Sequence, residues 1–192
     1  STLLASSAAS DVYKRQLYYH PGIRWHIRRI YVLNPIEFTT IRRNEVKGKI
    51  LGGTAMRIAQ GKEDEPYLVT TKQIVQRASM VLTNVHYVIE AEFEMLPEKA
   101  APGDNPGKFQ DIVTRRMRKG QCFSTPYFGC REFPAHFKQW EGGPIPTIDE
   151  TRDLGFMLYD FDYSDPQNIT PLYFRAKMEH GVIQVAGCEV FR

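Results

Sequence analysis

The stretch VHYVIEAEFEM, residues 85–95, decides the fold class of this chain, because apolar and polar side chains alternate along it. Alternation with a period of two is typical of a β-strand that buries one face and exposes the other. The polar row carries Glu90, Glu92 and Glu94. We expect this acidic face to lie away from any nucleic acid, since carboxylates repel phosphates.

A short helix is predicted downstream of this strand, within NPGKFQDIVTRRMRKG, residues 105–120. Asn105 is a favoured N-cap residue, Pro106 suits the first helical position, and Gly120 is placed to end the helix. One face is apolar at helical spacing and is predicted to pack, with Phe109, Ile112, Val113 and Met117. The other faces carry the cations Lys108, Arg115, Arg116, Arg118 and Lys119, which fit either a solvated helix face or a phosphate-binding surface.

Several other segments also have the pattern of strands. In IRWHIRRIYVL, residues 23–33, an apolar row alternates with a mostly basic row, to which Ile30 is assigned. Further strands are predicted at 155–163, 172–179 and 181–185, and a hairpin is predicted from 121–125 and 130–133 around the turn 126–129. Many strands with few helices predict an α+β fold with an antiparallel sheet.

Length and composition limit the class of protein. The chain has 192 residues, 42% of them hydrophobic and 12% aromatic, which suits one globular core or at most two small domains. The three cysteines, Cys122, Cys130 and Cys188, have no CxxC spacing, so we expect a reduced protein without a metal or other cofactor. No apolar run is long enough to span a bilayer, and we expect a cytoplasmic protein.

The net charge of +3 is small, so the distribution of the cations matters more than their total. Residues 42–49 hold a dense group, Arg42, Arg43, Lys47 and Lys49, which is a better candidate for nucleic-acid binding than the strand at 23–33. Residues 1–16 are rich in serine and alanine and lack helix or strand signals. We interpret them as a non-native or disordered leader.

Five segments together carry a resemblance to a known family. They are LYYHPGIRWHIRRIYVLNPIEFTTIRRNEVKGKI, QRASMVLTNVHYVIEAEFEM, NPGKFQDIVTRRMRKGQCFSTPYFGCREFPAHF, LGFMLYDFDY and FRAKMEHGVIQV. They resemble the fifth CRISPR-associated (Cas) protein of the Dvulg, or type I-C, subtype, which is the RAMP-superfamily subunit of Cascade that processes pre-crRNA. The resemblance implies a ferredoxin-like (RRM-like) domain at 17–137, without the family's first strand, and a smaller C-terminal antiparallel β region at 138–192.

The resemblance also implies a function. A member of this family binds CRISPR repeat RNA and cuts it as an endoribonuclease without a metal ion. It then retains the 5′ handle of the crRNA within Cascade, where the backbone and large subunits are its partners in antiviral defence. A non-catalytic subunit that only holds the handle is the alternative. A general RRM-like RNA-binding domain lacks support, because no RNP-type string is present.

The resemblance carries over two catalytic positions, residue by residue. Tyr18 matches the Tyr of the family's Tyr-Trp dipeptide, and Lys108 matches the Lys of its Gly-Lys-His motif. Phe109 stands where the family has His, so a proton-transferring side chain is missing there, and His20 is the nearest substitute in the sequence. The predicted RNA-binding residues are Arg42, Arg43, Lys47, Lys49, Arg115, Arg116, Arg118 and Lys119.

Overall fold

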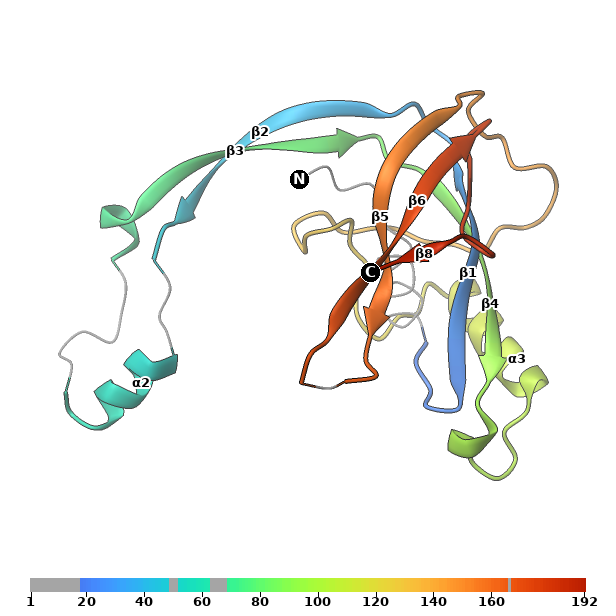
Figure 1. Ribbon diagram of the computed structural model, residues 1–192, viewed down its shortest axis with the longest axis horizontal. Helices are drawn as coiled ribbons and strands as arrows, with labels where there is room; N and C mark the ends of the chain where they lie inside the picture. Colours follow the sequence, from blue (N-terminus) through green and yellow to red (C-terminus); the bar gives the residue numbers. More distant parts are fainter. Residues whose placement is uncertain (1–17, 49–51, 63–68, 166) are drawn as a thin grey trace. The chain divides into compact units, whose positions relative to one another are not determined.

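The computed structural model describes residues 18–48, 52–62, 69–165 and 167–192, which divide into two compact units (Figure 1). The larger unit comprises 18–36 together with 84–192, and the smaller unit comprises Glu37–Thr83. The interpretation of 1–16 as a leader and the prediction for Lys49 fall outside the described residues.

A six-stranded antiparallel sheet forms the framework of the larger unit. Its strands are β4 (Tyr87–Met95), β1 (Ile23–Val32), β7 (Val182–Gln184), β6 (Thr170–Glu179) and β5 (Arg152–Asp162) in that order, and β8 (Val190–Phe191) also pairs with β6. The 3-10 helix η2 (Pro97–Lys99) and the helix α3 (Pro106–Arg118) follow β4 in the chain. Antiparallel strands with few helices confirm the predicted α+β class and its ferredoxin-like (RRM-like) character.

An irregularity in β1 changes which of its side chains face the core. The pairing with β4 shifts between Ile27 and Arg29, so Arg28 is the extra residue of a β-bulge. Beyond the bulge the alternation changes phase, and Ile30 and Val32 are buried. The assignment of Ile30 to the exposed basic row was wrong, because one inserted residue moves every later side chain to the opposite face.

The core lies where β1, β5, β6 and β7 bring apolar side chains together. Phe174, Ala176 and Met178 alternate along β6 and are wholly buried, as a period of two requires. The other buried members of this cluster are Ile27, Ile30, Val32, Met157, Ile183 and Val185.

A tight turn at His180 and Gly181 joins β6 to β7. Both residues have positive φ, 47° and 75°, as in the hairpin turns whose twist matches that of the strands. A side chain at Gly181 would collide with the backbone of Ile148. The Gly181 carbonyl also accepts a hydrogen bond from the N–H of Val32 at 2.8 Å, so the turn is tied to β1.

The two ends of α3 form as predicted. The Asn105 side chain accepts a hydrogen bond from the N–H of Lys108 at 2.9 Å, which caps the first turn. Gly120 has a φ of 62° and its N–H donates to the Met117 carbonyl, while the N–H of Gln121 donates to the Arg116 carbonyl at 2.9 Å. These two bonds are a Schellman motif, which ends the helix sharply.

The hairpin predicted around 126–129 was wrong. Only an isolated bridge joins Tyr127 to Pro134, and the structure places no strand within 121–137. Pro126 and Pro134 lack the N–H that a strand ladder needs. The segment instead makes close turns, such as the bond from the N–H of Cys130 to the Phe128 carbonyl at 2.9 Å.

The smaller unit is a two-stranded ribbon (Figure 1). β2 (Glu37–Val46) and β3 (Ile74–Thr83) pair antiparallel over their whole length. The helix α2 (Gly52–Ala59) and the 3-10 helix η1 (Thr70–Lys72) lie in the connection between them. Where side chains of 37–83 are described, none is buried, so this part of the ribbon lacks a core.

Backbone pairing crosses the boundary that the resemblance implied between 137 and 138. β7 pairs with β1 and also with β6, so strands from both sides belong to one sheet. The partition into domains at 17–137 and 138–192 stays a prediction.

Candidate active site and RNA-binding surface

Tyr18 and Lys108, the two residues predicted to be catalytic, both lie beside the buried ring of Phe109. The ring centroids of Tyr18 and Phe109 are 6.1 Å apart, and Nζ of Lys108 lies 5.9 Å from the Phe109 centroid. The indole N–H of Trp25 in β1 donates to the Tyr18 carbonyl at 3.2 Å, which ties the segment before β1 to the sheet. The fold therefore brings the two residues together from distant parts of the sequence.

Arg116 adds a second cation to this group. Its Cζ lies 5.3 Å from the centroid of the Tyr18 ring, within the range of a cation–π interaction. Lys108 and Arg116 are two helical turns apart and share one face of α3. The Tyr18 side chain is thus close to two positive charges supplied by a single helix.

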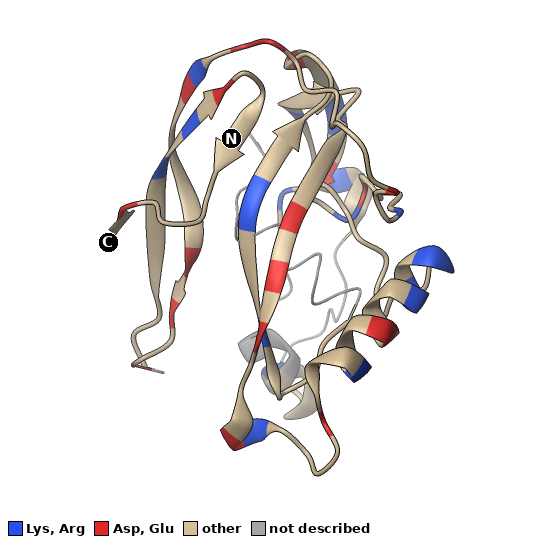
Figure 2. Ribbon diagram, turned by 90° about the vertical axis from the view of Figure 1, so that its right-hand side faces the viewer, with Lys and Arg blue, Asp and Glu red and all other residues tan. Residues whose placement is uncertain are grey.

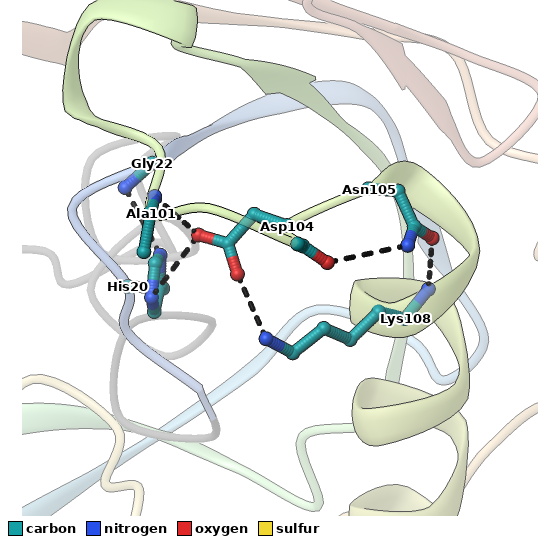
Figure 3. Close-up of polar contacts among 7 residues, drawn as sticks. His20, Gly22, Ala101, Asp104, Asn105 and Lys108 are labelled. Carbon is teal, nitrogen blue, oxygen red and sulfur yellow. Dashed lines mark hydrogen bonds and ion pairs between the residues drawn. The ribbon is translucent and has the colours of Figure 1, made fainter.

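Asp104 links His20 to Lys108 (Figure 3). Its Oδ1 accepts a hydrogen bond from Nζ of Lys108 at 2.8 Å, and its Oδ2 accepts one from the N–H of Ala101 at 2.8 Å. The Asp104 side chain is only 1% exposed. Sequence reasoning missed this residue, although an Asp four positions before a Lys at a helix start is the spacing of an ion pair.

These contacts set the protonation states of the group. Burial raises the pKa of the Tyr18 phenol above its ordinary 10.0, although the positive charges of Arg116 and Lys108 act in the opposite direction. The hydrogen bond from Lys108 lowers the pKa of Asp104, and the same bond raises the pKa of Lys108. At neutral pH the site therefore holds a neutral phenol, a carboxylate and an ammonium group.

His20, the suggested substitute for the missing family His, faces groups of the fold itself. Its ring lies 4.8 Å from the Phe109 ring, and its Nδ1 accepts a hydrogen bond from the N–H of Gly22 at 3.1 Å. Its Nε2 lies 3.8 Å from Oδ2 of Asp104. With Nδ1 acting as an acceptor, Nε2 carries the proton and points toward a carboxylate, so this arrangement favours a structural role.

The predicted RNA-binding cations of α3 lie toward its C-terminal end (Figure 2). Arg115, Arg118 and Lys119 are exposed, and Arg116 is half-buried. The helix C-terminus carries a partial negative charge, which stabilises cations placed there. Three exposed cations therefore lie at the C-terminal end of α3.

The acidic row of β4 and the basic row of β1 share one face of the sheet, side by side in Figure 2. Arg29 binds Glu90 through Nε at 2.8 Å, Arg28 lies 3.4 Å from Glu92, and His26 Nε2 lies 3.1 Å from Glu94. The pairing of the two rows offsets much of the repulsion expected from the glutamates, because the strand register sets cations beside them.

The cations of 42–48, the described part of this group, do not form one cluster on the ribbon. Arg42 and Arg43 are successive residues of β2 and point to opposite faces. Arg43 and Arg77 are opposite each other in the ladder, and both form ion pairs with Glu45, at 3.4 and 3.2 Å. Arg42 in β2 and Lys47, which directly follows β2, are exposed, so they remain the more accessible cations of this group.

Comparison with known families gives a match along most of the chain. The family described as CRISPR-associated protein (Cas_Cas5) matches residues 6–186. The chain belongs to this Cas5 family. The family match includes most of the segment 1–16, whose interpretation as a leader stays a prediction.

Two curated relatives of the Cas5 family extend this result. The chain is 38% identical over 190 residues to the CRISPR pre-crRNA endoribonuclease Cas5d of Mannheimia succiniciproducens, which covers 95% of this chain and 83% of the relative. It is 30% identical over 186 residues to the protein of the same name from Thermus thermophilus, covering 88% and 74% of the two chains. The predicted resemblance to the type I-C protein is confirmed.

Two crystal structures share the fold. A functionally uncharacterized protein from Streptococcus mutans and a CRISPR-associated protein each superpose with a TM-score of 0.66 over 100% of this chain and 87% of theirs. Their sequence identity of 20% restricts the comparison to the fold. In the part of the chain that the structure describes, no helix combines the length and the apolar character needed to cross a membrane.

Proposed function

We propose that this chain binds CRISPR repeat RNA, cleaves pre-crRNA as an endoribonuclease and keeps the 5′ handle as a subunit of type I-C Cascade in the cytoplasm. The name of the relative that shares 38% identity supports the reaction. The observation that carries the proposal is that the Tyr18 ring and Nζ of Lys108 lie 6.1 and 5.9 Å from the centroid of one buried ring, that of Phe109. The backbone and large subunits of Cascade are the proposed protein partners.

In the proposed cleavage reaction, Tyr18 and Lys108 have different roles. In metal-independent cleavage the 2′-oxygen attacks phosphorus, the O2′–P bond forms and the P–O5′ bond breaks, which leaves a 2′,3′-cyclic phosphate and a 5′-hydroxyl. Tyr18 stays a neutral phenol because its pKa is raised, so it orients the 2′-hydroxyl by hydrogen bonding. Lys108 stays an ammonium group and stabilises the charge that develops on the phosphorane.

The replacement of the family's His by Phe109 lowers the cleavage rate that we expect. Phenylalanine can neither accept nor donate a proton, so the proton of the 2′-hydroxyl leaves to water and O5′ takes one from water. Loss of one acid–base group typically costs about 10²–10⁴ in rate. This substitution favours slow cleavage, and it is the observation that keeps a non-catalytic handle-binding subunit as the second candidate function.

The deciding experiment incubates the purified chain with its cognate repeat RNA in EDTA and follows single-turnover cleavage. Lys108→Ala should lower the rate about 10²–10³-fold, the typical cost of removing one group that stabilises the transition-state oxyanion. Tyr18→Phe should lower the rate less, because the ring stays. RNA affinity should change much less than rate in both variants, since the lost contacts belong to the transition state.

Matched controls are available close by. Tyr19→Phe removes the same hydroxyl from an adjacent residue whose side chain is 66% exposed, and Lys177→Ala removes one exposed cation from β6. Both should cleave like the wild-type chain. Tight RNA binding without any cleavage by the wild-type chain would select the non-catalytic function instead.

A further inference from the structure

Phe123 is the most exposed large apolar side chain in the described part of the chain. It is 89% exposed, whereas the next values in this class are 66%. An isolated phenylalanine so fully in water gains nothing from folding, because its ring remains hydrated. Its neighbours Ser124 and Thr125 are also exposed, so nothing in the local sequence covers it.

The backbone that carries Phe123 is anchored on both sides. The N–H of Gln121 donates to the Arg116 carbonyl at 2.9 Å, which fixes the segment to the end of α3. The carbonyl of Pro126, a buried residue, accepts a hydrogen bond from the N–H of Ala135 at 2.8 Å. A ring presented from a short anchored segment loses little conformational freedom when a ligand stacks on it.

Cations lie immediately before this ring in the chain. Phe123 comes four positions after Lys119, the last of the basic group with Arg115 and Arg118, so the ring is at most about 14 Å of extended chain from it. From 106 to 123 the basic residues are Lys108, Arg115, Arg116, Arg118 and Lys119, against the single acid Asp111. A polyanion held by this group would pass close to the ring.

We infer that Phe123 is a stacking platform for an unpaired base of RNA bound along the cationic end of α3. This inference rests on the proposed function and adds to it a base-contacting residue outside the Tyr18 and Lys108 site. Stacking on an aromatic ring accepts any base, because each base has a π-face, while the cations hold the backbone phosphates. An exposed ring beside clustered Arg and Lys is the combination that such binding uses.

The test measures the affinity of cognate repeat RNA for the full chain with substitutions at this position. Phe123→Ala should raise Kd about 5- to 150-fold, the range for loss of one stacked base. Phe123→Tyr should bind like the wild-type chain, and Phe123→Leu should resemble the alanine variant, since leucine is apolar but has no ring. The plot of log affinity against log salt should keep its slope, because no charge is removed.

Phe156→Ala is the matched control, because Phe156 is 62% exposed on β5 and its loss should not change RNA affinity. Both positions are exposed, so the three substitutions at Phe123 and the one at Phe156 should leave the chain folded. Wild-type affinity in Phe123→Ala, or equal affinity in the leucine and tyrosine variants, would overturn the inference while the proposed function stands; a protein contact is then the better explanation of the exposed ring. Absence of RNA binding by the wild-type chain would overturn both.

Discussion

At the scale of single residues, Phe109 organises the candidate active site. Its side chain is wholly buried, and its ring contacts the rings of Tyr18, His20 and Phe93. Phe109 therefore provides a buried packing surface beside the catalytic candidates Tyr18 and Lys108. Phe109, in place of the His that the resemblance implies here, supplies no titratable group and packs against Phe93, which joins α3 to β4.

Phe109→His tests whether the family pattern can be restored by one substitution. The imidazole would have to occupy a wholly buried place among aromatic rings, which typically costs about 1–3 kcal/mol for a polar group without a fitted partner. We expect a lower free energy of unfolding in urea and no increase in the cleavage rate. A faster variant of unchanged stability would show that the position opens to the substrate.

At the scale of elements, α3 combines two functions through its two faces. The buried face holds Phe109 and Val113, and the caps at Asn105 and Gly120 hold the helix in place at both ends. Its polar faces carry the cations, with Lys108 in the first turn and the others toward the end. An RNA strand that contacts Lys108 at one end of α3 and the arginines at the other end would therefore run along the whole helix.

The salt dependence of RNA binding measures how many of these cations contact phosphate. Each lost contact should make the slope of log affinity against log salt shallower by about 0.7 for single-stranded RNA. We expect the double variant Arg115→Ala with Arg118→Ala to flatten the slope by up to two such steps. Replacing Arg175 and Lys177 on β6 with Ala removes the same charge elsewhere and should leave the slope unchanged. An unaltered slope in the α3 variant would remove these residues from the interface.

At the scale of the whole molecule, the two units differ in what stabilises them. The larger unit has a buried cluster that joins β1, β5, β6 and β7. The ribbon consists of paired strands without a buried side chain where the structure describes it, and it exposes Phe38, Ile74 and Met80. A two-stranded ribbon of this kind is marginally stable in water by itself, so its order depends on its attachment or on a ligand.

Replacing Glu37–Thr83 with a short turn should therefore leave the larger unit folded. Leu33 and His86 are already joined by a backbone hydrogen bond at 3.0 Å, so the ends of β1 and β4 are close enough for a tight connection. The thermal midpoint should move by less than about 4 °C, which corresponds to about 1 kcal/mol. RNA affinity should fall if Arg42 and Lys47 contact phosphate. A loss of cooperative unfolding would show that the ribbon contributes to the core.

Much of the fold was predictable because many of its strands and helix ends depend on short-range sequence patterns. Alternation identified β4, β5 and β6, and capping residues identified both ends of α3, since each signal depends on neighbours within a few positions. The bulge at Arg28 was missed, although the successive residues Arg28 and Arg29 interrupt the alternation of 23–33, and the pairing with β4 places the extra residue there.

The candidate site divides in the same way. Residue chemistry and the resemblance were sufficient to nominate Tyr18 and Lys108, and to notice the unusual Phe109. Only the tertiary structure decided that these side chains meet, that Asp104 holds Lys108, and that His20 faces the fold's own groups. The physical reason is that side-chain type and local spacing are properties of the sequence. Distance, burial and pKa arise only when the segment before β1 and the strand β4 pack against α3.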